Sequence, residues 1–172
     1  MGMFQRQGEH CVAPFTADEV RVLRRVVSEM RQLLSDGFDR RDPAIERLFP
    51  DAYPDKPTDS AQFRRYTEVE LKRRKLDQAH AVLATLPTDT DGEVRLDSAA
   101  AESWLRALND ARLAMAVRLE IKDEDQADAE IRELESQGLG TPRSYQLAVY
   151  TYLGYLQESL LQALTGPDPA QP

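Results

Sequence analysis

The sequence is poor in the residues that form disulfides and zinc sites. Its 172 residues contain one cysteine, Cys11, and two histidines, His10 and His80. A single thiol cannot close a disulfide within the chain, which fits a reducing compartment. No cysteine pair has zinc-ligand spacing, and a site built on Asp77 and His80 would need further ligands from elsewhere. We therefore expect no metal and no disulfide framework.

Long apolar runs and catalytic motifs are also missing. No stretch approaches the roughly eighteen consecutive apolar residues of a membrane-spanning helix. The residues before Pro14 include Arg6 but no apolar segment of a signal peptide. No nucleophile elbow or phosphate-binding glycine loop occurs. We therefore expect a cytoplasmic protein that has no membrane partner, no cofactor and no enzymatic activity.

Apolar residues recur at helical spacing in several segments. The first follows Thr16, which has the spacing of a capping box with Glu19. Its apolar seam consists of Val20, Leu23, Val27, Met30 and Leu34. Further helices are predicted over about 43–49, 60–86, 97–119, 124–137 and 142–164, with a proline-rich loop at 50–57. The fold class is thus mainly α, a bundle of five or six helices.

The segment before the first helix has a different pattern. Residues 4–15 are partly aromatic or β-branched and are interrupted by Gly8, which predicts a small N-terminal β-hairpin over about 3–15. A short extended piece is predicted at 93–96. With 41% hydrophobic residues, the chain suits one domain. We expect a single helical domain over 1–172, with a helical core at about 16–165 and a disordered tail at 166–172.

The last predicted helix is apolar around much of its circumference. One face carries Tyr145, Val149, Tyr152, Leu156 and Leu160. A second set widens that face and comprises Leu147, Tyr150, Leu153, Leu161 and Leu164. Such a helix is either central to the core or shared with another subunit, so a homodimer is one interpretation.

Charge is unevenly distributed along the chain, whose formal net charge is −8. The segment Lys122 to Glu135 carries seven acids and two cations, whereas Phe63 to Lys75 carries six cations and two acids. An acidic protein is repelled by phosphate unless its cations gather in one place. The six cations are the predicted residues for binding a protein partner or nucleic acid, and they are Arg64, Arg65, Lys72, Arg73, Arg74 and Lys75.

The basic segment also has an ordinary interpretation. Arg64 with Glu68, Glu68 with Lys72, and Glu70 with Arg74 have i,i+4 spacing. Each such pair stabilises a helix by roughly 0.2–0.5 kcal/mol and would make a solvated surface.

A helix-turn-helix is a further interpretation of residues 124–164. The four-residue turn from Gly138 to Thr141 would place Arg143, Ser144 and Gln146 to read bases. The strongly acidic first helix argues against it, because that helix would lie along the phosphates.

The segment Trp104 to Leu119 combines an apolar stripe with polar residues. Asn109, Asp110 and Arg112 are predicted to form a polar network that sets helix packing. Together with Phe63 to Lys75, this segment resembles the AosR family, actinobacterial proteins formerly described as a domain of unknown function and grouped as oxidative-stress transcriptional regulators. The resemblance spans roughly Phe15 to Leu164.

The resemblance implies a transcriptional role in the oxidative-stress response, through a partner such as a sigma factor of RNA polymerase. Reversible thiol oxidation usually ends in a disulfide, and Cys11 has no partner in the chain, with Gln7 and Phe15 four residues to either side. His10 and Arg6 would favour a thiolate if they lie nearby. Cys11 is therefore either a redox site or a small buried hydrophobe.

These observations together predict a non-enzymatic regulator that acts through protein–protein contacts. The acidic balance favours a basic protein partner over independent DNA binding. The alternative is a regulator that binds DNA directly through the basic helix Arg64 to Lys75.

Overall fold

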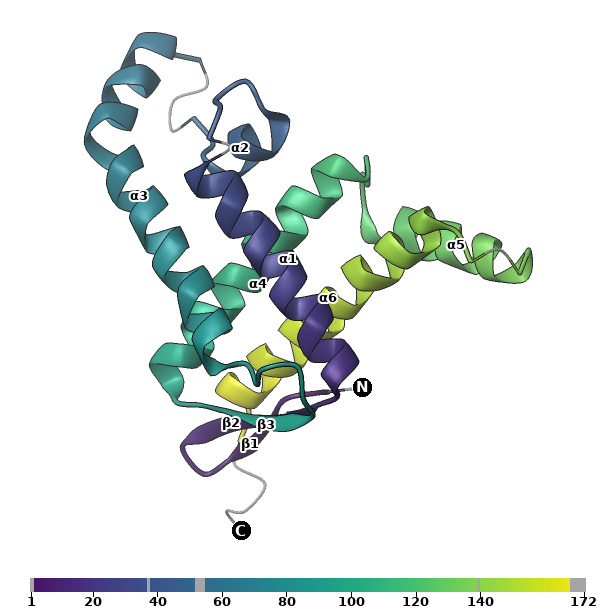
Figure 1. Cartoon of the computed structure of the whole chain (residues 1–172). Helices are drawn as coiled ribbons and strands as arrows, with labels where there is room; N and C mark the ends of the chain where they lie inside the picture. Colours follow the sequence, from purple (N-terminus) through teal and green to yellow (C-terminus); the bar gives the residue numbers. More distant parts are fainter. Residues whose placement is uncertain (1, 37, 52–54, 139, 168–172) are drawn as a thin grey trace.

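The fold is mainly α-helical, as the apolar periodicity predicts (Figure 1). The computed structural model describes residues 2–36, 38–51, 55–138 and 140–167, except for the side chains of 64–66. The elements in chain order are β1 (Gln5–Gln7), β2 (His10–Phe15), α1 (Ala17–Ser35), α2 (Pro43–Leu48), α3 (Pro57–Thr85), β3 (Gly92–Leu96), α4 (Ser98–Arg118), α5 (Glu124–Ser136) and α6 (Pro142–Thr165). Most of the predicted tail, residues 168–172, lies outside the described residues.

The predicted hairpin is part of a three-stranded antiparallel sheet in the order β1-β2-β3. Gly8 occupies the turn between β1 and β2 with a positive φ of 62°, which glycine adopts without a steric penalty. The extended piece predicted at 93–96 becomes β3 and pairs with β2, with Cys11 opposite Leu96 and Phe15 opposite Gly92. A third strand explains the stability of the sheet, because a two-stranded ribbon alone is marginal.

Side chains cap most of the helices at the positions that the sequence indicates. The capping box of Thr16 and Glu19 begins α1 and is confirmed. Asp97 accepts a hydrogen bond from the Ala100 amide at the start of α4. Helix α3 begins at Pro57, three residues before the predicted start. Proline is well suited to the first helical turn, and Lys56 before it makes no capping bond that would mark the boundary.

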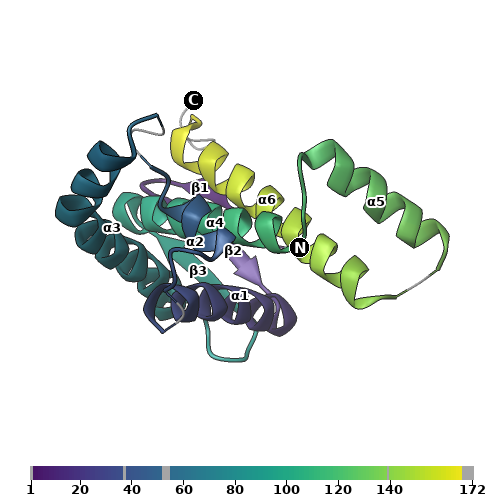
Figure 2. The same cartoon turned by 90° about the horizontal axis from the view of Figure 1, so that it is seen from above.

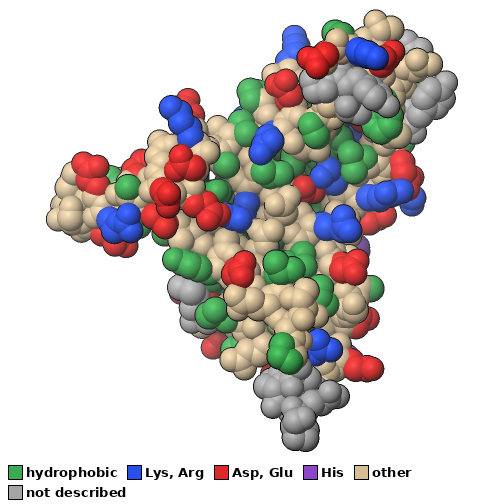
Figure 3. Space-filling model, turned by 180° about the vertical axis from the view of Figure 1, so that it is seen from behind, with side chains coloured by type: hydrophobic (Ala, Val, Ile, Leu, Met, Phe, Trp, Pro, Cys, Tyr) green, Lys and Arg blue, Asp and Glu red, His purple; other side chains and the backbone are tan. Residues whose placement is uncertain are grey.

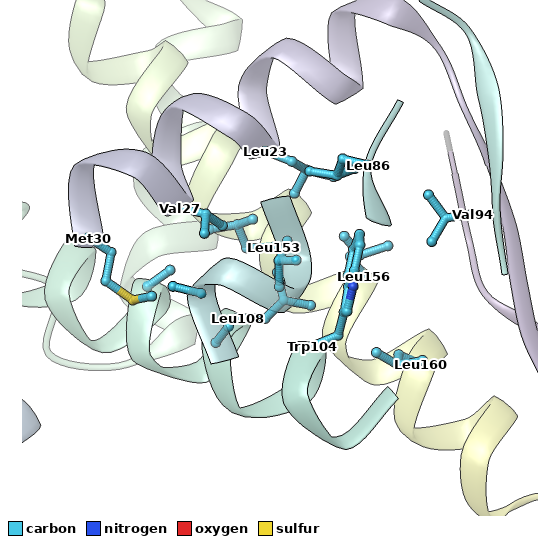
Figure 4. Packing of buried hydrophobic residues seen from close by; sticks show 14 of the residues in the cluster. Leu23, Val27, Met30, Leu86, Val94, Trp104, Leu108, Leu153, Leu156 and Leu160 are labelled. Atoms are coloured by element: carbon cyan, nitrogen blue, oxygen red, sulfur yellow. The ribbon is translucent and has the colours of Figure 1, made fainter. Parts of the chain in front are cut away.

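Helix α4 lies at the centre and packs against α1, α2, α3 and α6. Trp104 on α4 is fully buried, with its ring centroid 5.5 Å from that of Phe4 and 6.1 Å from that of Phe15. Its indole N–H donates to the Thr85 hydroxyl at 2.8 Å, so the one polar atom of the ring is satisfied. The predicted seam of α1 faces this core and is buried throughout (Figure 4). Trp104 therefore ties the sheet to the bundle.

Helix α6 is less evenly buried than its composition predicts. Leu153, Leu156 and Leu160 lie in the core, but Tyr145 is 52% exposed and Leu161 is 44% exposed. Both belong to the broad apolar surface predicted for α6, and they are left uncovered within the chain because α1 and α4 cover only part of the circumference of α6. The predicted homodimer stays a prediction.

Helix α5 stands apart from the rest of the bundle and packs on the first half of α6 (Figure 2). We call α5 the acidic arm. A separate small apolar cluster attaches it, with Leu119, Ala127, Leu147 and Tyr150 as the buried members. Among the described residues, no helix is both long enough and apolar enough to cross a membrane.

Candidate functional site

The predicted basic surface on α3 is divided between two faces of the helix. Lys75 faces the bundle, where its ammonium lies 2.8 and 2.9 Å from the two carboxylate oxygens of Asp110 on α4. The Lys75 side chain is 13% exposed and that of Asp110 is 6% exposed, so this is a buried ion pair. Lys72 lies 4.6 Å from the centroid of the Phe38 ring, in cation–π geometry. Two of the six predicted binding cations thus stabilise the fold.

Burial raises the pKa of the Asp110 carboxyl above its ordinary value. The Lys75 ammonium opposes this rise through hydrogen bonds and attraction, and Arg106 adds a smaller attraction. The charged form of Asp110 therefore depends on Lys75 for its stability. Removing one partner of a buried pair leaves an uncompensated charge, which typically costs several kcal/mol.

Arg73 and Arg74 lie on the exposed face of α3 and both bond to Glu70. These pairs lower the pKa of Glu70, chiefly through its hydrogen bonds from Arg73 and Arg74. The predicted i,i+4 pair of Glu70 with Arg74 is confirmed.

The other predicted pairs on α3 have different outcomes. Glu68 bonds to Arg40 rather than to Lys72, so the predicted pair with Lys72 is wrong. The side chains of Arg64 and Arg65 lie outside the described residues. A binding role for the exposed cations stays a prediction.

The three residues of the predicted polar network do not meet. Asn109 is exposed, Asp110 bonds to α3, and Arg112 reaches in another direction to α5 and α6. One Arg112 amino group donates to the Gln157 side chain at 3.2 Å and another contacts Glu124. The buried Asp110 and the half-buried Arg112 each fix a contact between helices, but α4 separates the two interactions.

Gly154 makes room for the Arg112 side chain on α6. A Cβ at position 154 would lie only 3.2 Å from an Arg112 nitrogen, closer than side-chain carbons normally approach. The Arg112 guanidinium also lies 5.0 Å from the Tyr150 ring centroid. Arg112 is therefore held against α6 by packing as well as by hydrogen bonds.

Two of the three residues predicted to read bases have internal partners, whereas the third, Gln146, is exposed. The Arg143 guanidinium donates to both carboxylate oxygens of Glu130 on α5 and to the Leu119 carbonyl oxygen. Ser144 takes part in the capping box of Thr141 at the start of α6. Arg143 thus holds the acidic arm in place and Ser144 caps α6, and this use of them disfavours the helix-turn-helix interpretation.

Cys11 lies on β2 with 4% of its surface exposed. Burial raises the pKa of its thiol, and the attraction of Arg6 on the neighbouring strand lowers it by less. Arg6 lies opposite Cys11 and favours the thiolate, as expected from the sequence, but the loss of hydration on burial outweighs this effect. Cys11 has the environment of a structural cysteine.

No group of three or more potential metal ligands is present within the part of the chain that the structure describes. Asp77 and His80 are both exposed on α3.

Two concave features are grooves between helices. One groove of about 490 Å³ lies between α1, α4 and α6, and it is mostly apolar, with Val26, Met30 and Met115 among its lining residues. A second, of about 430 Å³, lies between α4, α5 and α6.

These features define a helical bundle with an internal ion pair and a projecting acidic helix. The family described as a domain of unknown function (DUF2017) matches residues 1–164, and the chain belongs to this family. No solved structure matches.

Curated relatives come from mycobacteria. A Mycobacterium leprae protein whose name carries the AosR designation is 35% identical over 136 residues, or 72% of this chain and 58% of that protein. Proteins of Mycobacterium bovis and Mycobacterium tuberculosis, each named oxidative stress regulator AosR, are 33% identical over 138 residues, which cover 73% of this chain and 59% of theirs. The chain thus spans just under three fifths of the length of these relatives. The family resemblance read from the sequence is confirmed, and the relatives support a regulatory role in oxidative stress.

Replacing Lys75 by methionine should destabilise the protein by about 3–5 kcal/mol at neutral pH, because Asp110 then loses its buried partner. The loss should shrink as the pH falls. Without Lys75 the pKa of native Asp110 rises further above its unfolded value, so the variant gains stability relative to the wild type as Asp110 takes up a proton. Urea unfolding of both proteins at several pH values measures this difference.

The matched control for Lys75→Met is Arg73→Met, which removes a cation from the exposed face of the same helix. This change should alter stability by less than about 0.5 kcal/mol, with little dependence on pH. Equal losses of stability in the two variants would contradict the conclusion that charged Asp110 depends on Lys75. A loss of stability in Lys75→Met that grows as the pH falls would contradict it as well.

Cys11 should react slowly with a thiol reagent in the folded protein at neutral pH, because it is buried and its pKa is raised. Absorbance with a disulfide reagent measures the rate, and unfolding in guanidinium should release one fully reactive thiol. Rapid labelling of the native protein, at the rate of the unfolded chain, would show instead that Cys11 is an accessible redox site.

Proposed function

We propose that this protein is a non-enzymatic regulator of transcription in the oxidative-stress response, and that it acts in the cytoplasm through contact with a protein partner. The observation that carries the proposal is the 33–35% identity to proteins named oxidative stress regulators. A sigma factor or another component of the transcription machinery is the proposed partner.

The charge distribution supports contact with a protein rather than with DNA. The acidic arm projects from the bundle and carries most of the seven acids of the segment Lys122 to Glu135. Arg143 at the adjoining end of α6 is bonded to Glu130. A phosphate backbone would be repelled by this surface, whereas a basic protein surface would be attracted.

DNA binding through α3 is the alternative, and Arg73 and Arg74 are the described residues that favour it. Both are exposed, but both share Glu70, so this cluster carries one net positive charge. Lys72 and Lys75 are turned toward the bundle. This geometry favours the protein-contact proposal.

Deleting the gene from its host should abolish or strongly reduce the induction of peroxide-responsive transcripts, and the complete wild-type protein should restore it. RNA sequencing before and after a peroxide pulse measures the response. A second stress, such as heat, is the control and should leave the two strains alike. An unchanged peroxide response in the deletion strain would contradict the proposed role.

The protein-contact mechanism has its own test with the purified protein. Fragments of the promoters that lose induction should not be shifted by the protein in gel electrophoresis, even at low salt. A DNA-binding regulator would instead shift them, would lose affinity steeply as salt rises, and would lose it again in Arg73→Glu/Arg74→Glu. That second result would favour the alternative.

A further inference from the structure

The second groove, between α4, α5 and α6, combines an apolar floor with acidic edges. Leu105 on α4 and Tyr155 and Leu161 on α6 supply large apolar surfaces. Tyr155 is 55% exposed and Leu161 is 44% exposed, so neither is covered by the bundle. Ala127 and Asp128 of the acidic arm form one end of the groove. Exposed apolar side chains grouped in a concavity are typical of a binding surface.

The length of the groove suits a helix. Along α6 its lining residues run from Tyr150 to Leu161. At a rise of about 1.5 Å per residue this stretch is roughly 16 Å long, or about three turns of a bound helix. Both walls are helices, so their side-chain ridges leave furrows that accept the ridges of another helix. The groove includes no residue of the sheet, so no strand edge is offered to an extended peptide.

The charged residues that line the groove favour a positively charged ligand. The lining includes three acids, Glu124, Asp128 and Glu158, and one cation, Arg112. Arg112 already contacts Glu124 and Gln157, and it packs on Tyr150. Asp128 makes no hydrogen bond or ion pair with any other described residue, and Glu158 accepts only the neutral amide of Gln162. Two carboxylates are therefore left to meet cations from outside.

The surface around the groove is also negatively charged. Figure 3 shows acidic side chains gathered at the base of the arm, with hydrophobic side chains beside them. The groove between α1, α4 and α6 differs, because its charged lining consists of Arg25, Arg118 and Glu29. Its rim thus has no excess of acid, and it offers no equal attraction to a basic segment.

We propose that the groove between α4, α5 and α6 binds a basic amphipathic helix of a protein partner. Apolar side chains at helical spacing on that helix pack on Leu105, Tyr155 and Leu161, and lysine or arginine side chains on its edges pair with Asp128 and Glu158. Charge complementarity of this kind speeds association and selects the partner. The inference builds on the proposed function, since it gives a surface to the protein contact.

The test uses the full-length ¹⁵N-labelled protein and two synthetic peptides of about 18 residues, long enough to form a helix on binding. One has leucine on one face and lysine on the other. Its counterpart has glutamate in place of every lysine. The lysine peptide should shift amide resonances that line the groove and saturate at one site, whereas the glutamate peptide should leave them unchanged.

Two variant pairs separate groove binding from general attraction to an acidic protein. Asp128→Lys with Glu158→Lys should weaken binding of the lysine peptide by about tenfold or more, as loss of two pairing charges predicts. Glu133→Lys with Glu135→Lys makes the same change in net charge on exposed positions of the arm outside the groove, and it should weaken binding by less than about twofold. Leu161→Asp, at an exposed apolar position, should also weaken binding by about tenfold.

Several results would overturn the inference. They are the absence of shifts at the groove, shifts confined to the groove between α1, α4 and α6, and equal weakening by both charge pairs. Groove resonances that shift with the concentration of the protein alone would show that a second copy covers this surface. None of these results bears on the peroxide response of the deletion strain, so a failure of the groove is distinguishable from a failure of the proposed function.

Discussion

The burial of α4 on several sides is the constraint on which the rest of the structure depends. Polar groups of a helix surrounded by α1, α2, α3 and α6 lose hydration, which favours hydrogen-bonded partners inside the bundle. Asp110 forms an ion pair with Lys75, and the Trp104 indole N–H donates a hydrogen bond to the Thr85 hydroxyl. Both partners lie on α3, so these two contacts fix the axial position of α3 against α4. The cations of α3 are consequently shared between the core and the surface.

The molecule therefore divides into a dense bundle and a lightly attached arm. The bundle and the sheet share one continuous apolar core, whereas α5 has its own small cluster. Two arginines, Arg112 and Arg143, join the arm to the bundle through Glu124 and Glu130. Such ion pairs are at least partly exposed and contribute little stability individually. An element held in this way can keep an acidic surface and a groove open to a partner without weakening the core.

Local features of the sequence predict the helices well and the pairing between distant segments poorly. The seam from Val20 to Leu34 repeats over about four turns, and the structure buries all of it. Pairing of Glu93 to Leu96 with β2 joins segments about 80 residues apart, and no local pattern specifies such a partner. The pair of Lys75 and Asp110 is of the same kind, because both residues also suit an exposed helix surface.

The surface was harder to predict than the core for a physical reason. Spacing along α3 suggested a bond between Glu68 and Lys72, but Arg40 from the connection between α1 and α2 reaches Glu68 instead. Intrahelical ion pairs are weak, so a tertiary partner displaces them easily. The groove lined by Leu105, Tyr155 and Leu161 likewise joins two helices, and its only sequence signal is the unusually broad apolar surface of α6.

Hydrogen–deuterium exchange of the unbound protein tests most directly whether the acidic arm can open locally while the helical bundle stays folded. Amides of α4 between Trp104 and Ala114 should exchange last, close to the rate set by global unfolding. Amides of α5 should exchange much earlier, through local opening that leaves the bundle intact. Protection of α5 equal to that of α4, with both lost together, would contradict this account.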